Sequence, residues 1–362
     1  MRLVSVEHPG DLRDIGQGGG YDVLDICHPL GKEVVEWVDE VEECAMRIDC
    51  IVNRDGRRFG FDALLRALPA HLHACGIDLQ GTKVFVAGDA HAQALTRRLG
   101  AIIAPGNEAK FLVNGLEGTE RFIDLDDFPR LETIIDIAPH VKRTALQFDA
   151  RLRGARYCGG AWLAARLLDE KKRLYTREKP DEEKIFHLAQ ELVRKKRNIV
   201  LIGMPTSGKT TISSVFAREM GWKLIEMDDE IEKTMGMTIT DCFAQKGEAF
   251  FRRLETQVAK DLRNASGCVI STGGGVIKNS ENLRYLGENG LVAWLDRRID
   301  QLFPSDSRPL SQSIDALRKM YAERQPVYRW LCDVRLDNTG TISDTVESLK
   351  TIAAGGAPWI CG

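Results

Sequence analysis

The segment from Gly203 to Thr210 has the residue types and spacing of a phosphate-binding loop. It reads Gly-Met-Pro-Thr-Ser-Gly-Lys-Thr and lies between an apolar run at 198–202 and a segment that can begin a helix at 211–217. Backbone N–H groups of such a turn converge on one point, where the helix dipole adds partial positive charge. Lys209 can reach the β- and γ-phosphates, and Thr210 can ligate Mg²⁺. The segment therefore predicts a bound nucleotide and leaves the reaction open.

Acidic residues stand at the end of the next apolar run, 223–227. Glu226 and Asp228 alternate there, at the strand end where open α/β sheets bind their ligands. One carboxylate can help to hold Mg²⁺ through water, and the other can accept a hydrogen bond from a substrate hydroxyl. An N-cap role for Asp228 or Asp229 on the following helix explains the same residues equally well.

A braced arginine is expected on the helix that begins at Gly247. Glu248, Arg252 and Glu255 recur at helical spacing, so that the guanidinium lies between two carboxylates. Held in this way, it can bind a substrate carboxylate through two hydrogen bonds. The alternative is a ladder of ion pairs on the protein surface.

Three more signals follow along the chain. The glycines 273–275 can let a ligand approach the backbone closely, although a plain turn also uses glycine. Arg308 lies in a polar stretch and can close over the γ-phosphate. Arg324 is expected in the last turn of a helix that ends at Pro326, where a cation also stabilises the helix end.

Taken in order, these motifs resemble the shikimate kinase family over residues from about 198 to the mid-350s. The resemblance implies transfer of the γ-phosphoryl group of ATP to the 3-hydroxyl of shikimate, with Mg²⁺. It implies catalytic roles for Lys209, Asp228 and Arg308, and substrate binding by Asp228, Arg252, Gly273, Gly274 and Arg324. It implies ATP contacts at Gly203, Pro205, Thr206, Ser207, Gly208, Lys209, Thr210, Thr211 and Arg308, and a metal site near Thr210, Glu226 and Ser271.

Two positions depart from the family pattern. Glu226 stands where the family has an aspartate, so a metal-linked water must shift or be displaced. The arginine that helps to hold adenine has no counterpart just before Asp306, although Asn338 lies where a nucleotide-flanking loop is expected. A kinase for another small hydroxy acid such as gluconate, or a nucleotide-binding regulator without turnover, are the alternatives. Neither of them explains the paired arginines Arg252 and Arg324.

The N-terminal half resembles a shortened shikimate dehydrogenase from Tyr21 to about residue 168. The resemblance rests on the segments 26–29, 48–53, 55–56, 60–61, 81–88, 136–139 and 159–161. The family opens with a substrate-binding segment that needs tens of residues before Tyr21, so we expect a truncated domain.

Several residues that the dehydrogenase reaction needs have changed. Gly31 stands at the position of the catalytic lysine, with Lys32 one step out of register, and the partner aspartate motif has collapsed to 60–62. The dinucleotide turn carries Asp89 and His91 where small residues would allow pyrophosphate to approach. We therefore predict a catalytically inactive N-terminal domain that does not bind NADP. A bifunctional enzyme with relocated catalytic groups is the rival prediction.

The elements that would position these residues predict an α/β fold of two domains. Apolar runs at 83–87, 101–104 and 133–138 in the first half, and at 198–202, 223–227, 268–272 and 291–295 in the second, alternate with helix-length segments. This alternation predicts parallel sheets. We expect a Rossmann-like domain over 1–175, a linker helix over 176–196, a P-loop kinase domain resembling nucleoside-monophosphate kinases over 197–355, and a tail over 356–362. The charged segment 169–180 has little to bury and should contain the boundary.

Composition limits the partners. The 362 residues include 50 basic and 53 acidic side chains, with aromatic residues at 7%. Such a balance argues against nucleic acid as a partner. Nine cysteines without a C-x-x-C spacing predict a reducing compartment, and neither a disulfide framework nor a zinc site. No apolar run is long enough for a membrane span or a signal peptide, so we expect a cytoplasmic protein. A contact between the two domains is compatible with the sequence.

Overall fold

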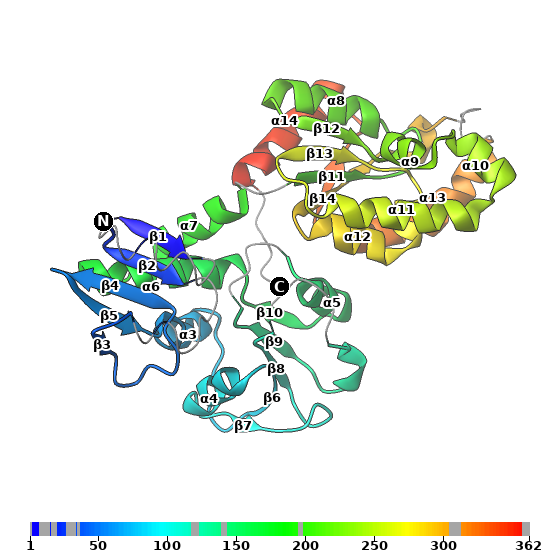
Figure 1. Ribbon diagram of the computed structural model, residues 1–362. Coiled ribbons are helices and arrows are strands. Elements are labelled where there is room, and N and C mark those ends of the chain that lie inside the picture. The colour runs from blue at the N-terminus through cyan, green and yellow to red at the C-terminus, as the bar shows by residue number, and fades with distance from the viewer. Residues whose placement is uncertain are drawn as a thin grey trace. The chain divides into compact units, whose positions relative to one another are not determined.

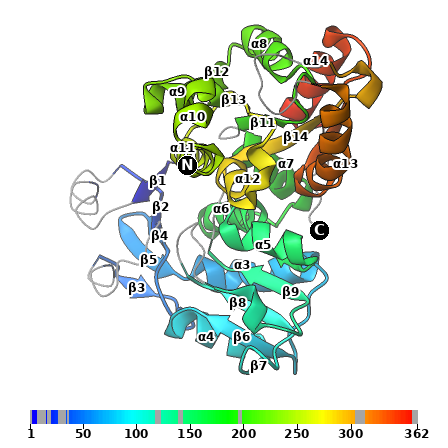
Figure 2. The same ribbon diagram turned by 90° about the vertical axis from the view of Figure 1, so that its right-hand side faces the viewer.

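The chain forms two compact units that divide between Leu192 and Val193 (Figures 1 and 2). The computed structural model describes residues 2–6, 15, 20–26, 34, 37–116, 123–138, 143–194, 198–303 and 313–356. Both units contain parallel sheets with crossover helices, which confirms the predicted α/β class.

The C-terminal unit is built on one parallel sheet of five strands in the order β12-β13-β11-β14-β15. Their bounds are β11 Asn198–Ile202, β12 Lys223–Glu226, β13 Cys268–Ser271, β14 Gly290–Asp296 and β15 Val334–Asp337. The central strand β11 is buried along its whole length, as expected for a continuous run of Ile, Val and Leu between two helical layers. The edge strand β15 was not predicted, because Val-Arg-Leu-Asp alternates and lacks such a run.

Helices cover both faces of this sheet. Figure 1 shows α8 and α14 on one face and α11 and α12 on the other. The helical elements are α8 Lys209–Met220, α9 Met227–Met235, α10 Ile239–Gln245, α11 Glu248–Leu262, η2 Val276–Lys278, α12 Ser280–Gly287, η3 Ile299–Gln301, α13 Ile314–Leu331, α14 Ile342–Thr351 and η4 Ile352–Gly356. The core between sheet and helices includes Phe216, Val269 and Leu349.

Helix α13 does not end at Pro326, so that expectation was wrong. The helix continues through the proline to Leu331. A proline inside a helix loses one backbone hydrogen bond and crowds the preceding turn. Here the burial of Tyr328 and Leu331 holds the final turn in place. Arg324 therefore lies in the body of α13, and a role in stabilising its C-terminal end does not apply.

The N-terminal unit contains two sheets. The first is mixed, with the order β1-β2-β4-β5-β3, and the second is parallel, with the order β10-β9-β8-β6-β7. The strands are β1 Leu3–Val6, β2 Val23–Ile26, β3 Glu40–Val41, β4 Cys50–Arg54, β5 Arg57–Phe61, β6 Lys83–Ala87, β7 Ile102–Ile103, β8 Phe111–Asn114, β9 Thr133–Asp136 and β10 Arg156–Cys158. The mixed sheet was not predicted. Its β4–β5 hairpin turns at Asp55 and Gly56, which have φ values of 52° and 86°, as a two-residue hairpin loop requires.

The two sheets of this unit share one apolar core. Residues of β4, β6, β8 and β9 pack there with Leu64 and Leu68 of α3 and with Leu163 and Leu167 of α6. The helical elements are α3 Ala63–Ala74, α4 Ala90–Arg98, η1 Leu125–Asp127, α5 Ala145–Arg153, α6 Ala161–Thr176 and α7 Glu182–Arg194.

The charged segment 169–180 is not an unpacked linker along its whole length, which corrects the expectation. Helix α6 continues to Thr176, and its residue Lys171 is buried beside Asp25, with which it forms an ion pair. Helix α7 packs back onto α6 through Ile185 and Ala189. The charges of α6 are accommodated because they meet opposite charges inside the unit.

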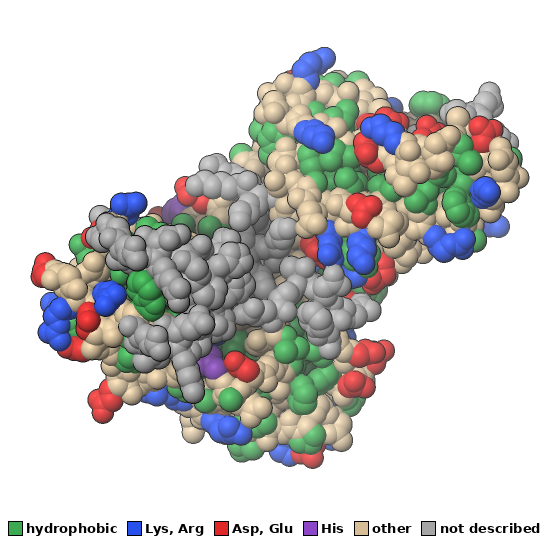
Figure 3. All heavy atoms as spheres, viewed as in Figure 1, with side chains coloured by type: hydrophobic (Ala, Val, Ile, Leu, Met, Phe, Trp, Pro, Cys, Tyr) green, Lys and Arg blue, Asp and Glu red, His purple; other side chains and the backbone are tan. Residues whose placement is uncertain are grey.

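The surface carries both kinds of charge. Figure 3 shows basic and acidic side chains interspersed on the visible face of each unit. Among the described helices, none combines the length and the apolar character that crossing a membrane requires.

Candidate active site

The phosphate-binding loop lies between β11 and α8, as the sequence predicts. Its backbone uses conformations that favour glycine: φ is 151° at Gly203 and 91° at Gly208. A Cβ atom on Gly203 would lie 2.7 Å from the carbonyl oxygen of Leu295 on the neighbouring strand. The buried Lys209 donates from Nζ to the carbonyl oxygens of Gly203 at 3.0 Å and Met204 at 2.8 Å. The lysine ammonium is thus already folded into the loop.

Helix α13 joins this loop to the glycine turn at 273–275. The fully buried hydroxyl of Tyr328 lies 2.9 Å from the carbonyl oxygen of Gly203 and 2.6 Å from that of Gly274. Arg324 donates from Nη1 to the same Gly274 oxygen at 2.7 Å. Burial raises the pKa of Tyr328 to about 12, so its hydroxyl remains a donor at neutral pH. Sequence reasoning had assigned Tyr328 no role.

The three glycines of the turn lie close to three different residues, and a side chain at any of them would approach a neighbour closely. A Cβ atom on Gly273 would lie 2.7 Å from Oδ1 of Asp228, and one on Gly274 would lie 2.9 Å from Cδ of Pro205. A Cβ atom on Gly275 would lie 2.6 Å from Nη2 of Arg252. One short turn therefore brings together the phosphate loop, the acidic strand end and the braced arginine.

The acidic residues differ from expectation in their local structure. Strand β12 ends at Glu226 and α9 begins at Met227, so Asp228 lies in the first turn of a helix and does not alternate with Glu226 along a strand. Glu226 occupies the N-cap position without a side-chain cap bond, so neither Asp228 nor Asp229 is the N-cap. Asp228 instead points its carboxylate toward Gly273.

Glu226 lies beside hydroxyl groups at the predicted metal site. Its carboxylate accepts from Thr210 Oγ1 at 3.4 Å and from Ser213 Oγ at 3.3 Å. Burial raises the pKa of Glu226, and hydrogen bonds from Ser271, Ser213 and Thr210 oppose that rise. Carboxylate and hydroxyl oxygens are the ligands that suit Mg²⁺, so this donor set fits the ion.

Arg252 is braced by Glu248 and Glu255, and this expectation is confirmed. Its Nη1 lies 3.0 Å from both carboxylate oxygens of Glu255, while Nε and Nη2 contact Oε1 of Glu248 at 3.1 and 3.0 Å. The alternative of a surface ladder does not describe Glu255, whose side chain is 1% exposed. Burial raises the pKa of Glu255, and Arg252 opposes the rise. Lys278 also contacts Glu248, at 2.6 Å, so Glu248 has a second cation to which it can turn.

Two further side chains reach the loop from the carboxyl ends of β14 and β15. Asn338 donates to the carbonyl oxygen of Ser207 at 2.5 Å. Arg297 follows β14, and its Nη1 lies 3.8 Å from the position of a Cβ atom on Gly208. Its buried Nε has no hydrogen-bond partner among the described residues. Sequence reasoning missed Arg297. Its position two residues after the predicted strand 291–295 was the available signal.

Other predicted residues fall as follows. Thr206 has φ of 59° and exchanges hydrogen bonds with the backbone of Phe303, and Ser207 is fully buried. Thr211 lies in the first turn of α8. Arg308 and the segment around it lie outside the described residues.

In the turn of the N-terminal unit that resembles a dinucleotide-binding turn, Asp89 and His91 make hydrogen bonds within the unit. Asp89 is the N-cap of α4 and accepts a hydrogen bond from the backbone N–H of Ala92 at 2.9 Å. His91 contacts Asp62, the fully buried N-cap of α3, at 3.0 Å. The helix start that would receive a pyrophosphate therefore carries a carboxylate. Gly31 and Lys32 lie outside the described residues.

Comparisons with known proteins found matches for each half of the chain. The family model described as "Shikimate kinase" matches residues 205–353. A shikimate kinase of Sulfurihydrogenibium sp. (strain YO3AOP1) is 38% identical over 161 residues, which are 43% of this chain and 96% of the relative. The structure of shikimate kinase from Acinetobacter baumannii in complex with shikimate covers 46% of this chain and 98% of its own, with 28% identity and a TM-score of 0.43. Shikimate 5-dehydrogenase from Thermus thermophilus, in complex with NADP(H) and shikimate, covers 51% of this chain and 83% of its own, with 20% identity and a TM-score of 0.41.

Proposed function

Because the chain belongs to the shikimate kinase family, we propose that its C-terminal unit transfers the γ-phosphoryl group of ATP to the 3-hydroxyl of shikimate. The observation that carries the proposal is the glycine turn at 273–275. It contacts the phosphate loop at Pro205, the acid Asp228 and the arginine Arg252, while Arg324 donates to its backbone. A small polyhydroxy acid needs this set: an acid for its hydroxyl groups and cations for its carboxylate.

Each residue has a role in the proposed transfer. Asp228 accepts the hydrogen bond of the attacking hydroxyl and orients it toward the phosphoryl group. Arg252 and Arg324 hold the substrate carboxylate, and Gly273 and Gly274 leave room for the ring against the backbone. Arg252 can receive that carboxylate when Glu248 turns to Lys278, its other partner.

The phosphate side of the site is held by the loop. Lys209 leaves the carbonyl oxygens it now contacts and moves onto the phosphates, and Arg308 supports the same charge. Thr210, Glu226 and Ser271 supply the oxygens for Mg²⁺, directly or through water. Mg²⁺ bound there would neutralise the oxygens of the β- and γ-phosphates. Pro205, Thr206, Ser207, Gly208 and Thr211 shape the remainder of the ATP cradle, and Arg297 lies where it can supply a further positive charge.

The proposal is tested by ADP release in a coupled assay with shikimate, gluconate or no added acceptor. We expect stimulation by shikimate alone. Arg252→Ala should raise the KM for shikimate more than tenfold because a bidentate, partly buried ion pair is lost. Arg253→Ala, on the exposed face of the same helix, is the matched control and should behave like the wild type. Stimulation by gluconate would favour the alternative kinase, and ATP binding without turnover would favour the regulator.

For the N-terminal unit we propose a domain that neither binds NADP nor reduces 3-dehydroshikimate. The proposal is supported by Asp89, whose carboxylate caps the helix that would face the pyrophosphate, and by His91, which is paired with Asp62. Steady loss of NADPH absorbance with 3-dehydroshikimate would favour the bifunctional alternative. We further propose a cytoplasmic protein that acts on small molecules, without nucleic acid or membrane as a partner.

A further inference from the structure

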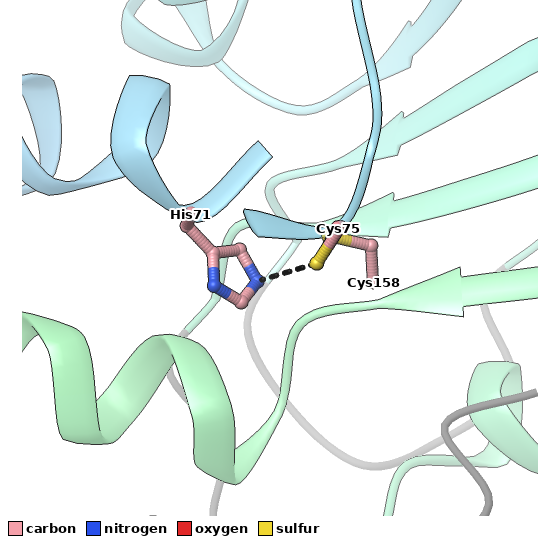
Figure 4. Close-up of side chains that lie close together, drawn as sticks. All are labelled: His71, Cys75 and Cys158. Atoms are coloured by element: carbon pink, nitrogen blue, oxygen red, sulfur yellow. Dashed lines mark hydrogen bonds between the residues drawn. The ribbon is translucent and has the colours of Figure 1, made fainter. Parts of the chain in front are cut away.

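His71, Cys75 and Cys158 meet in the N-terminal unit, at a place that the proposed reaction does not use (Figure 4). His71 and Cys75 are four residues apart at the end of α3, so their side chains lie on one face of the helix. Cys158 is the last residue of β10 and comes from 83 positions further along the chain. The three side chains converge in space although no sequence spacing relates Cys158 to the others.

The donor atoms of the three residues are within reach of a single ion. Cys158 Sγ lies 3.0 Å from Cys75 Sγ, and His71 Nε2 lies 4.0 Å from Cys75 Sγ. All three ligand atoms lie within 4.8 Å of one another. We propose that His71, Cys75 and Cys158 form a binding site for a borderline-soft divalent metal ion, with Zn²⁺ as the expected ion.

The geometry agrees with this assignment after small side-chain movements. In a tetrahedral zinc site with Zn–S bonds of about 2.3 Å, two sulfurs lie about 3.8 Å apart. Binding of the ion would therefore increase the distance between the two sulfurs by less than about 1 Å and would draw the imidazole toward them. Thiolate and imidazole ligands favour Zn²⁺ over Mg²⁺ or Ca²⁺, which require oxygen.

His71 gives a second, independent reason. Its side chain is buried, at 1% exposure, and its Nε2 has the Cys75 sulfur at 4.0 Å, too far for a strong hydrogen bond. A buried imidazole held this weakly is costly unless a ligand binds it. A metal ion on Nε2 would provide that ligand.

Cys75 is half-buried, so solvent can supply a fourth ligand. A bound ion would join the end of α3 to β10 and thereby stabilise the folded N-terminal unit.

The test uses the reduced, full-length chain and Co²⁺ as a spectroscopic probe for the zinc site. We expect one equivalent of Co²⁺ to produce thiolate-to-cobalt charge transfer and the visible bands of a tetrahedral site. Cys75→Ser and Cys158→Ser should each weaken binding more than about tenfold. Cys44→Ser, a half-buried cysteine that packs against the same core, is the matched control and should keep the bands. Bands that persist in Cys158→Ser, or a reduced wild type without bands, would overturn the proposal.

A second measurement needs no variant. Zn²⁺ should raise the thermal unfolding midpoint of the wild-type chain and protect two cysteines from alkylation, which peptide mass spectrometry would identify as Cys75 and Cys158. Protection of other cysteines, or of none, would refute the site. Formation of a Cys75–Cys158 disulfide under oxidant, with no metal binding in the reduced chain, would likewise refute it and assign the pair to thiol oxidation.

Discussion

The substitution Glu255→Gln tests how the substrate arginine is positioned. Arg252 Nη1 contacts both oxygens of Glu255 at 3.0 Å, and Asn282 donates to one of them at 3.3 Å. Glutamine keeps the shape of the side chain but has only one acceptor oxygen. Its NH2 group would therefore face at least one of the donors, Arg252 or Asn282. A hydrogen bond to a charged group contributes about 1.5–3 kcal/mol, and we expect the free energy of unfolding to fall by about 2 kcal/mol.

The same change should weaken substrate binding. Arg252 would remain tied to Glu248, which is 39% exposed and also paired with Lys278. If a less well positioned guanidinium weakens the free energy of shikimate binding by about 1.4 kcal/mol, the affinity falls tenfold. We therefore expect the KM for shikimate to rise about tenfold, with a smaller change in the KM for ATP.

Denaturant unfolding and the coupled ADP assay measure the two effects. Glu248→Gln is the matched control, and because this residue is more exposed both effects should be smaller. Burial raises the pKa of Glu255, so lowering the pH protonates it and should bring the wild type toward the variant. Wild-type stability and KM in Glu255→Gln, or larger effects in Glu248→Gln, would refute this explanation of how Arg252 is held.

Three further substitutions test other contacts. Tyr328→Phe removes the hydroxyl that joins the phosphate loop to the glycine turn, and should cost about 1 kcal/mol of unfolding free energy and raise the KM for ATP. Gly274→Ala places a Cβ atom 2.9 Å from Pro205 and, because overpacking costs about 1–3 kcal/mol, should lower kcat/KM more than tenfold; a wild-type value would contradict the close approach. Glu182→Gln breaks the pair with Arg166 between α6 and α7. The hydrogen bond from Arg166 lowers the pKa of Glu182 below 4.5, so above pH 4.5 the wild type should be more stable than the variant. The difference should be under about 1 kcal/mol, because the Glu182 side chain is 61% exposed. The difference should disappear as the pH falls through the lowered pKa, and denaturant unfolding at about pH 7 and about pH 3.5 would measure it.

Much of the fold followed from local pattern. The runs at 198–202 and 83–87 are strands with the predicted bounds. Short, mostly apolar runs between helix-length segments predict such strands. The first is buried along its whole length, and in the second Val84 is fully buried. The first sheet and β15 were missed, because short strands with polar residues at alternate positions resemble loops. Helix α13 passes through Pro326 because tertiary burial of Tyr328 outweighs the local preference.

The candidate site was predictable where its residues are close in the chain. The loop at 203–210 and the Glu248–Arg252–Glu255 brace depend on spacing within one turn or one helix, and the structure contains both. The depth at which Glu255 is buried was not predictable, because it depends on α12 packing against α11 and supplying Asn282.

The sequence by itself determined the phosphate loop, the family and the identity of the residues that can act on a nucleotide and a small acid. These are local properties of residue type and spacing. Only the tertiary structure decided that Gly273, Gly274 and Gly275 each touch a different part of the site, because β13 lies between β12 and β11 in the sheet. It also brought Cys158 to His71 and Cys75, where the spacing of the cysteines had indicated no metal site. Strand order and helix packing set such distances, and no short segment of sequence contains them.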